Sequence, residues 1–220
     1  RIGGVRYGET TEIYKFEKIK RAKRNALDAH PDRALIDLGV GENDEMAPLH
    51  VREKLNDEAN LVENRGYADN GIDEFKYAVA SFMSRNFGVE LDAETQVNHS
   101  IGSKPALAML PGAFINPGDV TLITVPGYPV AGTHTAYYGG ERYALPLLPE
   151  NDFLPDLDSI PADIRARAKL LVLNYPNSPT GAVAPVEFFK QAIEFAHENQ
   201  LVVANDAAHS LLSFSQDPMS

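Results

Sequence analysis

Two polar segments in the second half of the chain carry residues suited to binding a charged aromatic ligand. Segment 174–181 reads Asn-Tyr-Pro-Asn-Ser-Pro-Thr-Gly, segment 205–209 reads Asn-Asp-Ala-Ala-His, and each follows a short apolar run. If both runs are strands of an open parallel sheet, their carboxyl ends present the amide of Asn177 and the carboxylate of Asp206 at one edge. A carboxylate there can pair with a protonated aromatic nitrogen, because an adjacent opposite charge favours both ionised forms.

A third motif, Gly-Ser-Lys at 102–104, follows a predicted strand and opens a predicted helix. Backbone N–H groups at the helix start, the hydroxyl of Ser103 and the ammonium of Lys104 would together form a phosphate cradle. Ordinary N-capping by Ser103, with Lys104 in solvent, explains the same residues. The motif alone leaves both interpretations open.

The remaining candidates also have structural alternatives. Tyr128, in the turn Pro-Gly-Tyr-Pro, could stack on a planar ring or pack as a turn tyrosine. Asn177 could bind a ring hydroxyl or could only stabilise the turn in which it lies. Asp206 could be a helix N-cap. His209 would face the same side of a first helical turn as Asp206, although a lone histidine is more often structural. Their order at successive strand ends is more specific than any single residue.

Alternating apolar runs and helical patterns beyond residue 95 predict an α/β fold with a mostly parallel, doubly wound sheet covered by helices on both faces. The predicted strands are 96–101, 120–125, 141–147, 169–174 and 201–204. The predicted helices are 102–114, one after 129, 158–168 and 185–199. Upstream, the periodicity predicts helices at 12–29, 48–61 and 72–87 and a short strand at 35–41.

Composition narrows the functional classes. The 220 residues include 44% hydrophobic residues, so a substantial core can form, and the net charge of −11 argues against nucleic acid or an anionic membrane as the main partner. The chain has no cysteine, which excludes disulfides, thiol catalysis and cysteine-bound metal. No apolar run approaches the roughly 20 residues that span a bilayer. Residues 1–24 are polar and show no signal peptide, so the cytoplasm is the expected location. No metal site is expected.

At these residues the chain resembles the N-terminal part of a class I/II (fold type I) pyridoxal phosphate aminotransferase, over nearly its whole length. The segments 174–181 and 206–208 carry the family resemblance. Four further segments resemble the LL-diaminopimelate aminotransferases within that family: 13–20, 37–42, 64–71 and 101–107. The resemblance implies an N-terminal arm and small-domain segment at 1–45 and an incomplete cofactor-binding large domain at 46–220.

The resemblance also implies the cofactor, pyridoxal 5'-phosphate, and the residues that bind it. Ser103 and Lys104 match positions that hold the phosphate, and Tyr128 matches the aromatic residue on the ring. Asn177 matches the amide that binds the ring hydroxyl and lies on the side of the substrate α-carboxylate. Lys104 also matches a residue that reaches the substrate. Asp206 matches the partner of the pyridine nitrogen.

Other positions carry substrate and subunit roles by the same resemblance. Tyr67 matches a tyrosine that crosses a homodimer interface to the neighbouring subunit's phosphate, and Asp69 matches an acidic residue near the distal ammonium of the substrate. Tyr14 and Gly41 match substrate-lining positions. The family usually has tyrosine where this chain has His209, whose imidazole is shorter but still donates one hydrogen bond to the ring oxygen.

The implied reaction transfers an amino group between an amino acid and 2-oxoglutarate or glutamate, with LL-diaminopimelate formation in lysine biosynthesis as the expected case. The lysine that forms the Schiff base is expected beyond Asp206, and no lysine follows Lys190, so this chain holds no catalytic residue and is expected to be inactive alone. Another pyridoxal phosphate enzyme of the same fold, such as a different aminotransferase or a C–S lyase, remains open. A non-catalytic ligand-binding fragment is the alternative of a different class.

Overall fold

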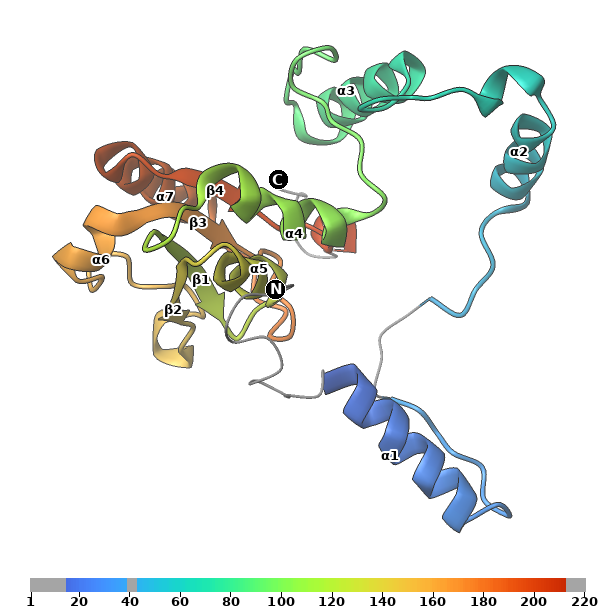
Figure 1. Ribbon diagram of the computed structural model, residues 1–220, viewed down its shortest axis with the longest axis horizontal. Helices are drawn as coiled ribbons and strands as arrows, with labels where there is room; N and C mark the ends of the chain where they lie inside the picture. The colour runs from blue at the N-terminus through green and yellow to red at the C-terminus, as the bar shows by residue number, and fades with distance from the viewer. Residues whose placement is uncertain (1–14, 39–42, 213–220) are drawn as a thin grey trace. The chain divides into compact units, whose positions relative to one another are not determined.

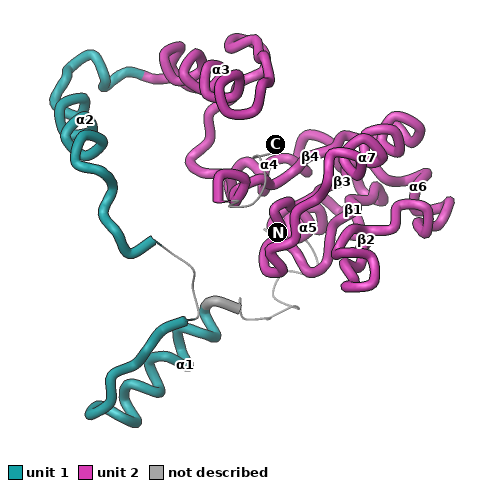
Figure 2. Tube along the Cα trace, turned by 180° about the vertical axis from the view of Figure 1, so that it is seen from behind, with its two compact units in different colours: residues 1–66 teal, residues 67–220 magenta. Residues whose placement is uncertain are grey.

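The computed structural model describes residues 15–38 and 43–212. Its chain divides into two compact units, residues 1–66 and 67–220, which are coloured separately in Figure 2. The domain boundary predicted after residue 45 stays a prediction. Within the described ranges, no helix is long and apolar enough to cross a bilayer.

The first unit is helical where it is described. Its helices are α1 (Lys15–Ala29), α2 (Leu49–Ala59) and the short 3-10 helix η1 (Val62–Arg65). An ion pair four residues apart, Arg21 with Glu17 at 2.9 Å, lies on the exposed face of α1 and adds little stability. The strand predicted at 35–41 is wrong over 35–38, which is irregular and pairs with no described strand. Residues 39–41 lie outside the described ranges.

The second unit begins with helix α3 (Asp73–Phe87), which ends at Gly88 in the left-handed conformation (φ 66°). The strand predicted at 96–101 is wrong, because residues 92–95 form a turn and 97–100 pair with no strand. The carboxylate of Asp92 accepts hydrogen bonds from the Glu94 N–H at 3.0 Å and the Thr95 hydroxyl at 2.7 Å. Such local side-chain bonds compete with extended structure.

A parallel sheet follows, and its strand order explains where a site can form (Figure 1). The described strands are β1 (Val120–Val125), β2 (Glu141–Pro146), β3 (Ala168–Leu173) and β4 (Val202–Asn205), in the order β2-β1-β3-β4. The chain moves from β1 outward to β2 and then returns to β3 on the other side of β1. The direction of winding therefore reverses between β1 and β3, where open α/β sheets bind ligands.

Helices cover both faces of this sheet, as predicted. They are α4 (Ser103–Phe114), α5 (Val130–Tyr137), α6 (Ala162–Arg167) and α7 (Val186–Asn199), with short 3-10 helices η2 (Pro149–Asn151) and η3 (Ser210–Leu212). Helix α6 is shorter than the predicted 158–168, because the Asp156 carboxylate binds the N–H groups of residues 158 and 159 in a turn.

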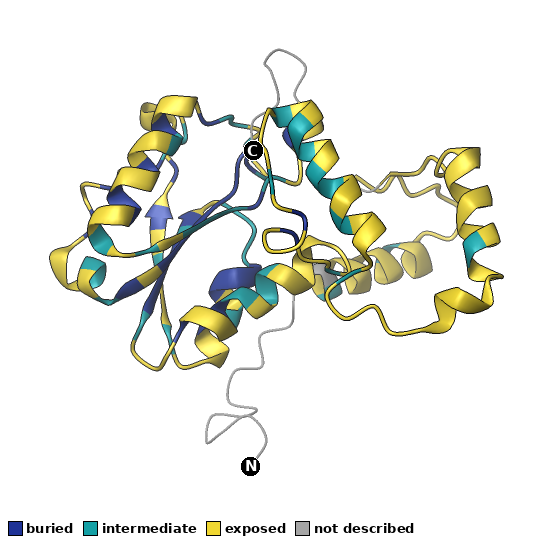
Figure 3. Ribbon diagram, turned by 90° about the horizontal axis from the view of Figure 1, so that it is seen from above, coloured by how far each residue is buried: buried dark blue, intermediate teal, exposed yellow. Residues whose placement is uncertain are grey.

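Two buried clusters show how strand side chains alternate between the faces. On β3, Leu171 and Leu173 belong to the cluster that contains α7, and Leu170 and Val172 belong to the cluster that contains α4 and α5 residues. Figure 3 shows these buried residues concentrated in the strands and the adjoining helices. Residues 170–173 of β3 are buried on both faces and form a continuous apolar run, whereas Lys169 near the start of the strand is exposed.

Candidate active site

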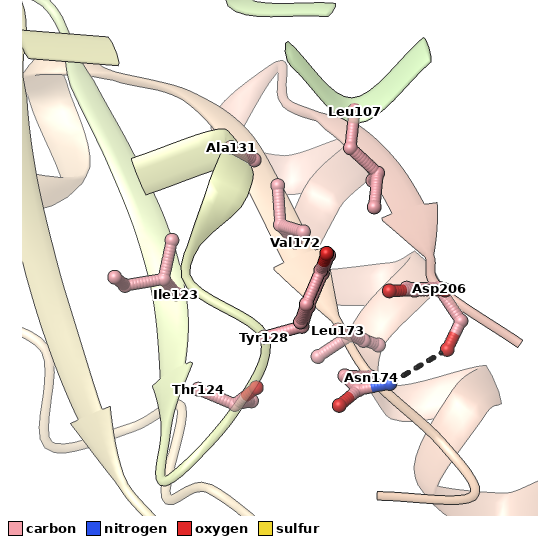
Figure 4. A pocket seen from close by; sticks show the side chains of 9 residues that line it. All are labelled: Leu107, Ile123, Thr124, Tyr128, Ala131, Val172, Leu173, Asn174 and Asp206. Atoms are coloured by element: carbon pink, nitrogen blue, oxygen red, sulfur yellow. Dashed lines mark hydrogen bonds between the residues drawn. The ribbon is translucent and has the colours of Figure 1, made fainter. Parts of the chain in front are cut away.

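A narrow pocket lies at the carboxyl ends of β1, β3 and β4, at the point where the winding reverses (Figure 4). Residues from four segments line it: Leu107, Ile123, Thr124, Tyr128, Ala131, Val172, Leu173, Asn174 and Asp206. Apolar side chains form most of the wall, and a few polar groups converge on it. This composition is typical of a small-molecule site.

Asp206 is the charged group of this pocket. It is the first residue after β4, is 8% exposed, and donates its backbone N–H to the Leu173 carbonyl at 2.9 Å. That bond extends the β3–β4 pairing by one residue and fixes the point where the side chain leaves the sheet. In Figure 4 the Asp206 carboxylate and the Tyr128 ring point into the same space.

Burial raises the pKa of the Asp206 carboxyl above its ordinary value, because desolvation disfavours the charged form. A backbone hydrogen bond from Ala208 and the nearby His209 oppose this effect without cancelling it. Within residues 15–38 and 43–212 the carboxylate forms no ion pair. A cationic ligand in the pocket would therefore add compensating charge beyond that of the exposed His209.

This raised pKa predicts how the stability of the ligand-free full-length protein depends on pH. A raised folded-state pKa means that the stability from Asp206 is present below its unfolded pKa and is lost as the pH rises through the folded value. Replacing Asp206 with asparagine removes this loss. We expect the variant to gain unfolding free energy relative to the parent protein as the pH rises from about 4, near the ordinary pKa of an aspartate, through the raised folded-state value. Urea denaturation across that range measures the difference, and a pH-independent difference would contradict the prediction.

Asn177 links the loop after β3 to the turn after β1. It is 2% exposed, and its Nδ2 donates to the Pro126 carbonyl at 3.2 Å. The Asn177 Oδ1 accepts two hydrogen bonds from Thr180, one from its hydroxyl at 2.7 Å and one from its backbone N–H at 3.2 Å. The Thr180 N–H fixes which side of the amide accepts, so the Nδ2 group carries a second hydrogen besides the one donated to Pro126. Asn177 itself lies outside the set of lining residues.

The predicted phosphate residues lie at the start of α4. Gly102 adopts φ 76° immediately before the helix, and Ser103 and Lys104 are exposed in its first turn. Leu107, which lines the pocket, is four residues after Ser103 and therefore on the same face of the helix. The helix start thus borders the pocket, and the phosphate role of both residues stays a prediction.

The other predicted residues are not brought into the pocket. His209 is exposed, and its charge acts to lower the pKa of the Asp206 carboxyl, against the effect of burial. Tyr67 and Asp69 are exposed on this chain, and their predicted roles in a neighbouring subunit's site remain untested. Tyr14 and Gly41 lie outside the described residues.

Several residues of the site were not identified from the sequence, and two of them make polar contacts with other residues of the site. Asn174 lines the pocket, and Thr180 orients the Asn177 amide. Both lie in the segment 174–181, but turn-forming residues are common in such segments and gave no separate signal. Only the three-dimensional structure shows which carbonyl or N–H each side chain reaches.

Comparisons with known proteins identify the family and agree with the fold. The family model for class I and II aminotransferases matches residues 33–220, and the chain belongs to that family. LL-diaminopimelate aminotransferase from Methanocaldococcus jannaschii is 60% identical over 100% of this chain and 53% of its own length. The enzyme of the same name from Aquifex aeolicus is 40% identical over 93% of this chain and 52% of its own.

Solved structures give the same result for the fold. Substrate-bound BacF from Bacillus subtilis superimposes with a TM-score of 0.90 at 34% identity, covering 96% of this chain and 53% of that one. Alanine aminotransferase from Pyrococcus furiosus gives a TM-score of 0.84 at 25% identity, with coverage of 96% and 53%. The chain spans about half the length of the relatives that it matches.

Proposed function

We propose that the protein containing this chain is a pyridoxal phosphate-dependent aminotransferase. The observation that carries the proposal is the buried Asp206 carboxylate, which lines one pocket with Tyr128 and whose raised pKa calls for a cationic partner. A protonated pyridine nitrogen is such a partner, and Tyr128 offers a ring face beside it. The residues present therefore fit this cofactor.

Bound pyridoxal phosphate supplies an electron sink for the charge left when a proton leaves the substrate Cα. The described residues would bind and orient it. Asp206 would hold the ring nitrogen in its protonated form, and the second Nδ2 hydrogen of Asn177 would donate to the ring oxygen. Ser103, Lys104 and the N–H groups at the start of α4 would hold the phosphate. His209 would add a hydrogen bond near the ring oxygen.

The proposed reaction exchanges an amino group between LL-diaminopimelate and the glutamate/2-oxoglutarate pair, in lysine biosynthesis. It is supported by relatives of that name at 40–60% identity over most of this chain. Substrate contacts from Tyr14, Gly41 and Asp69, a homodimer with Tyr67 at its shared site, and a cytoplasmic location belong to the same proposal. An alternative is amino transfer from another donor, because the strand-end residues do not select the side chain.

The test uses the full-length protein reconstituted with pyridoxal phosphate. We expect a visible absorption band that bleaches on adding LL-diaminopimelate, and 2-oxoglutarate should restore it. L-Alanine and L-aspartate serve as competing donors at equal concentration. Bleaching by these donors alone would reject the proposed substrate, and the lack of any cofactor band would reject the cofactor.

The turn that carries Tyr128 gives a further prediction, for Gly127→Ala. A Cβ at residue 127 would stand 2.5 Å from the backbone carbonyl oxygen of Thr124, and a backbone atom cannot move aside cheaply. The turn must shift, and the Tyr128 ring with it. We expect the dissociation constant of pyridoxal phosphate to rise about tenfold to a hundredfold, measured by fluorescence titration of the full-length protein. An unchanged constant would show that Tyr128 does not contact the ring.

A further inference from the structure

One side chain contacts both loops that carry the candidate site residues. Asn174 is the first residue after β3 and is 4% exposed. Its Nδ2 donates to the backbone carbonyl of Asp206 at 2.9 Å, the bond drawn as a dashed line in Figure 4. Its Oδ1 accepts the backbone N–H of Ser178, the neighbour of Asn177, at 3.1 Å.

Backbone pairing alone cannot hold these loops together. At the end of the β3–β4 ladder, the Asp206 N–H donates a backbone hydrogen bond to the Leu173 carbonyl at 2.9 Å. Beyond it, the loop after β3 contains Pro176 and Pro179, which have no N–H to donate. The Asn174 amide therefore continues the connection between the two chains past the end of the sheet. Both of its polar atoms are buried, so losing either bond leaves an unsatisfied group.

We propose that Asn174 is a positioning residue, which sets the Asp206 carboxylate relative to the Asn177 amide by binding the backbone of both loops. This inference rests on the proposed function, in which Asp206 binds the nitrogen and Asn177 the hydroxyl oxygen of one ring. Asn174 itself borders the pocket, but its Nδ2 and Oδ1 both bind the backbone of these two loops. Its loss would let the Asp206 backbone and the 177–181 turn move independently.

The chain contains a matched control in Asn205. This asparagine is the last residue of β4, at the same edge of the sheet. Its Oδ1 accepts the Tyr175 N–H at 2.9 Å, and its Nδ2 donates to the Tyr175 carbonyl at 3.1 Å. Asn205→Ala therefore removes two bonds of the same kind as Asn174→Ala does, but neither goes to Asp206 or Ser178.

The experiment compares Asn174→Ala and Asn205→Ala in the full-length protein. Carbodiimide labelling of Asp206, read by mass spectrometry on protein without cofactor, reports whether the carboxylate has left its buried place. Fluorescence titration with pyridoxal phosphate reports binding, and thermal unfolding reports stability. We expect Asn174→Ala to raise the labelling rate and the dissociation constant about tenfold each. Asn205→Ala should lower the melting temperature comparably and leave both quantities within about twofold of the parent.

A second variant covers a failure of Asn174→Ala to fold. Asn174→Asp keeps an oxygen that accepts the Ser178 N–H but has no hydrogen for the Asp206 carbonyl, so labelling of Asp206 should still rise. Equal effects of the 174 and 205 variants, or parent-like labelling in the 174 variants, would overturn the inference. A parent protein that binds no pyridoxal phosphate, but whose Asp206 labelling still responds to Asn174→Ala, would reject the proposed function and leave the positioning role intact.

Discussion

Replacing Asp206 with asparagine is expected to lower kcat/KM of the full-length protein by about 10²–10³-fold, the loss typical when one preorganised electrostatic group is removed from a site. Asparagine has nearly the same shape, so the pocket should survive. Its neutral amide cannot stabilise a cationic ring nitrogen as a carboxylate does. Steady-state kinetics with LL-diaminopimelate and 2-oxoglutarate measures the loss.

Asp158→Asn is a suitable control for this variant. Asp158 is exposed and lies outside the pocket. Asp158→Asn therefore changes the net charge by the same amount as Asp206→Asn and leaves the site unaltered. We expect its kcat/KM to equal that of the parent protein. If the two variants lose activity equally, or if Asp206→Asn keeps full activity, the proposed role of Asp206 is wrong.

Truncating Leu171 to alanine is expected to destabilise the full-length protein by about 2–5 kcal/mol, the range for large-to-small changes in a packed core. Leu171 is 0% exposed on β3, between β1 and β4, and belongs to the cluster that includes Leu122 and Phe188. The neighbours are held by the sheet and by α7, so they cannot close the cavity. Urea denaturation followed by circular dichroism gives the free energy of unfolding.

The comparison for this change is Leu148→Ala, at a leucine that is 48% exposed after β2. It removes the same atoms where solvent already reaches them, and we expect a loss below about 1 kcal/mol. A Leu171→Ala loss no larger than that of Leu148→Ala would show that the sheet is not the cooperative core of the protein.

The sequence predicted all four strands and a mostly parallel sheet, because short runs rich in apolar residues alternate with helical patterns there. Segments 35–38 and 96–101 were also predicted as strands but form none. A strand exists only where another strand accepts its hydrogen bonds, and periodicity cannot show a partner. At 92–95 the Asp92 side chain instead satisfies the backbone locally.

The sequence predicted the candidate site only in part, at the residues that directly follow strands. Asp206 and Tyr128 follow strands and were brought to one pocket, because carboxyl ends of neighbouring parallel strands share an edge. The helix N-cap alternative for Asp206 also has support, because its carboxylate accepts a hydrogen bond from the Ala208 N–H while it lines the pocket at 8% exposure. Asn174 was not predicted because its function depends on a carbonyl 32 residues away in the chain.

The walls of the pocket run from Leu107 to Asp206, so they come from distant parts of the chain that only the finished sheet brings together. Any molecule seated there ties these distant parts to one another and binds no partly assembled intermediate. Occupancy therefore shifts the folding equilibrium in proportion to the logarithm of ligand concentration. Under the proposed function, a shortage of pyridoxal phosphate would leave a larger fraction of the protein unfolded and open to proteolysis.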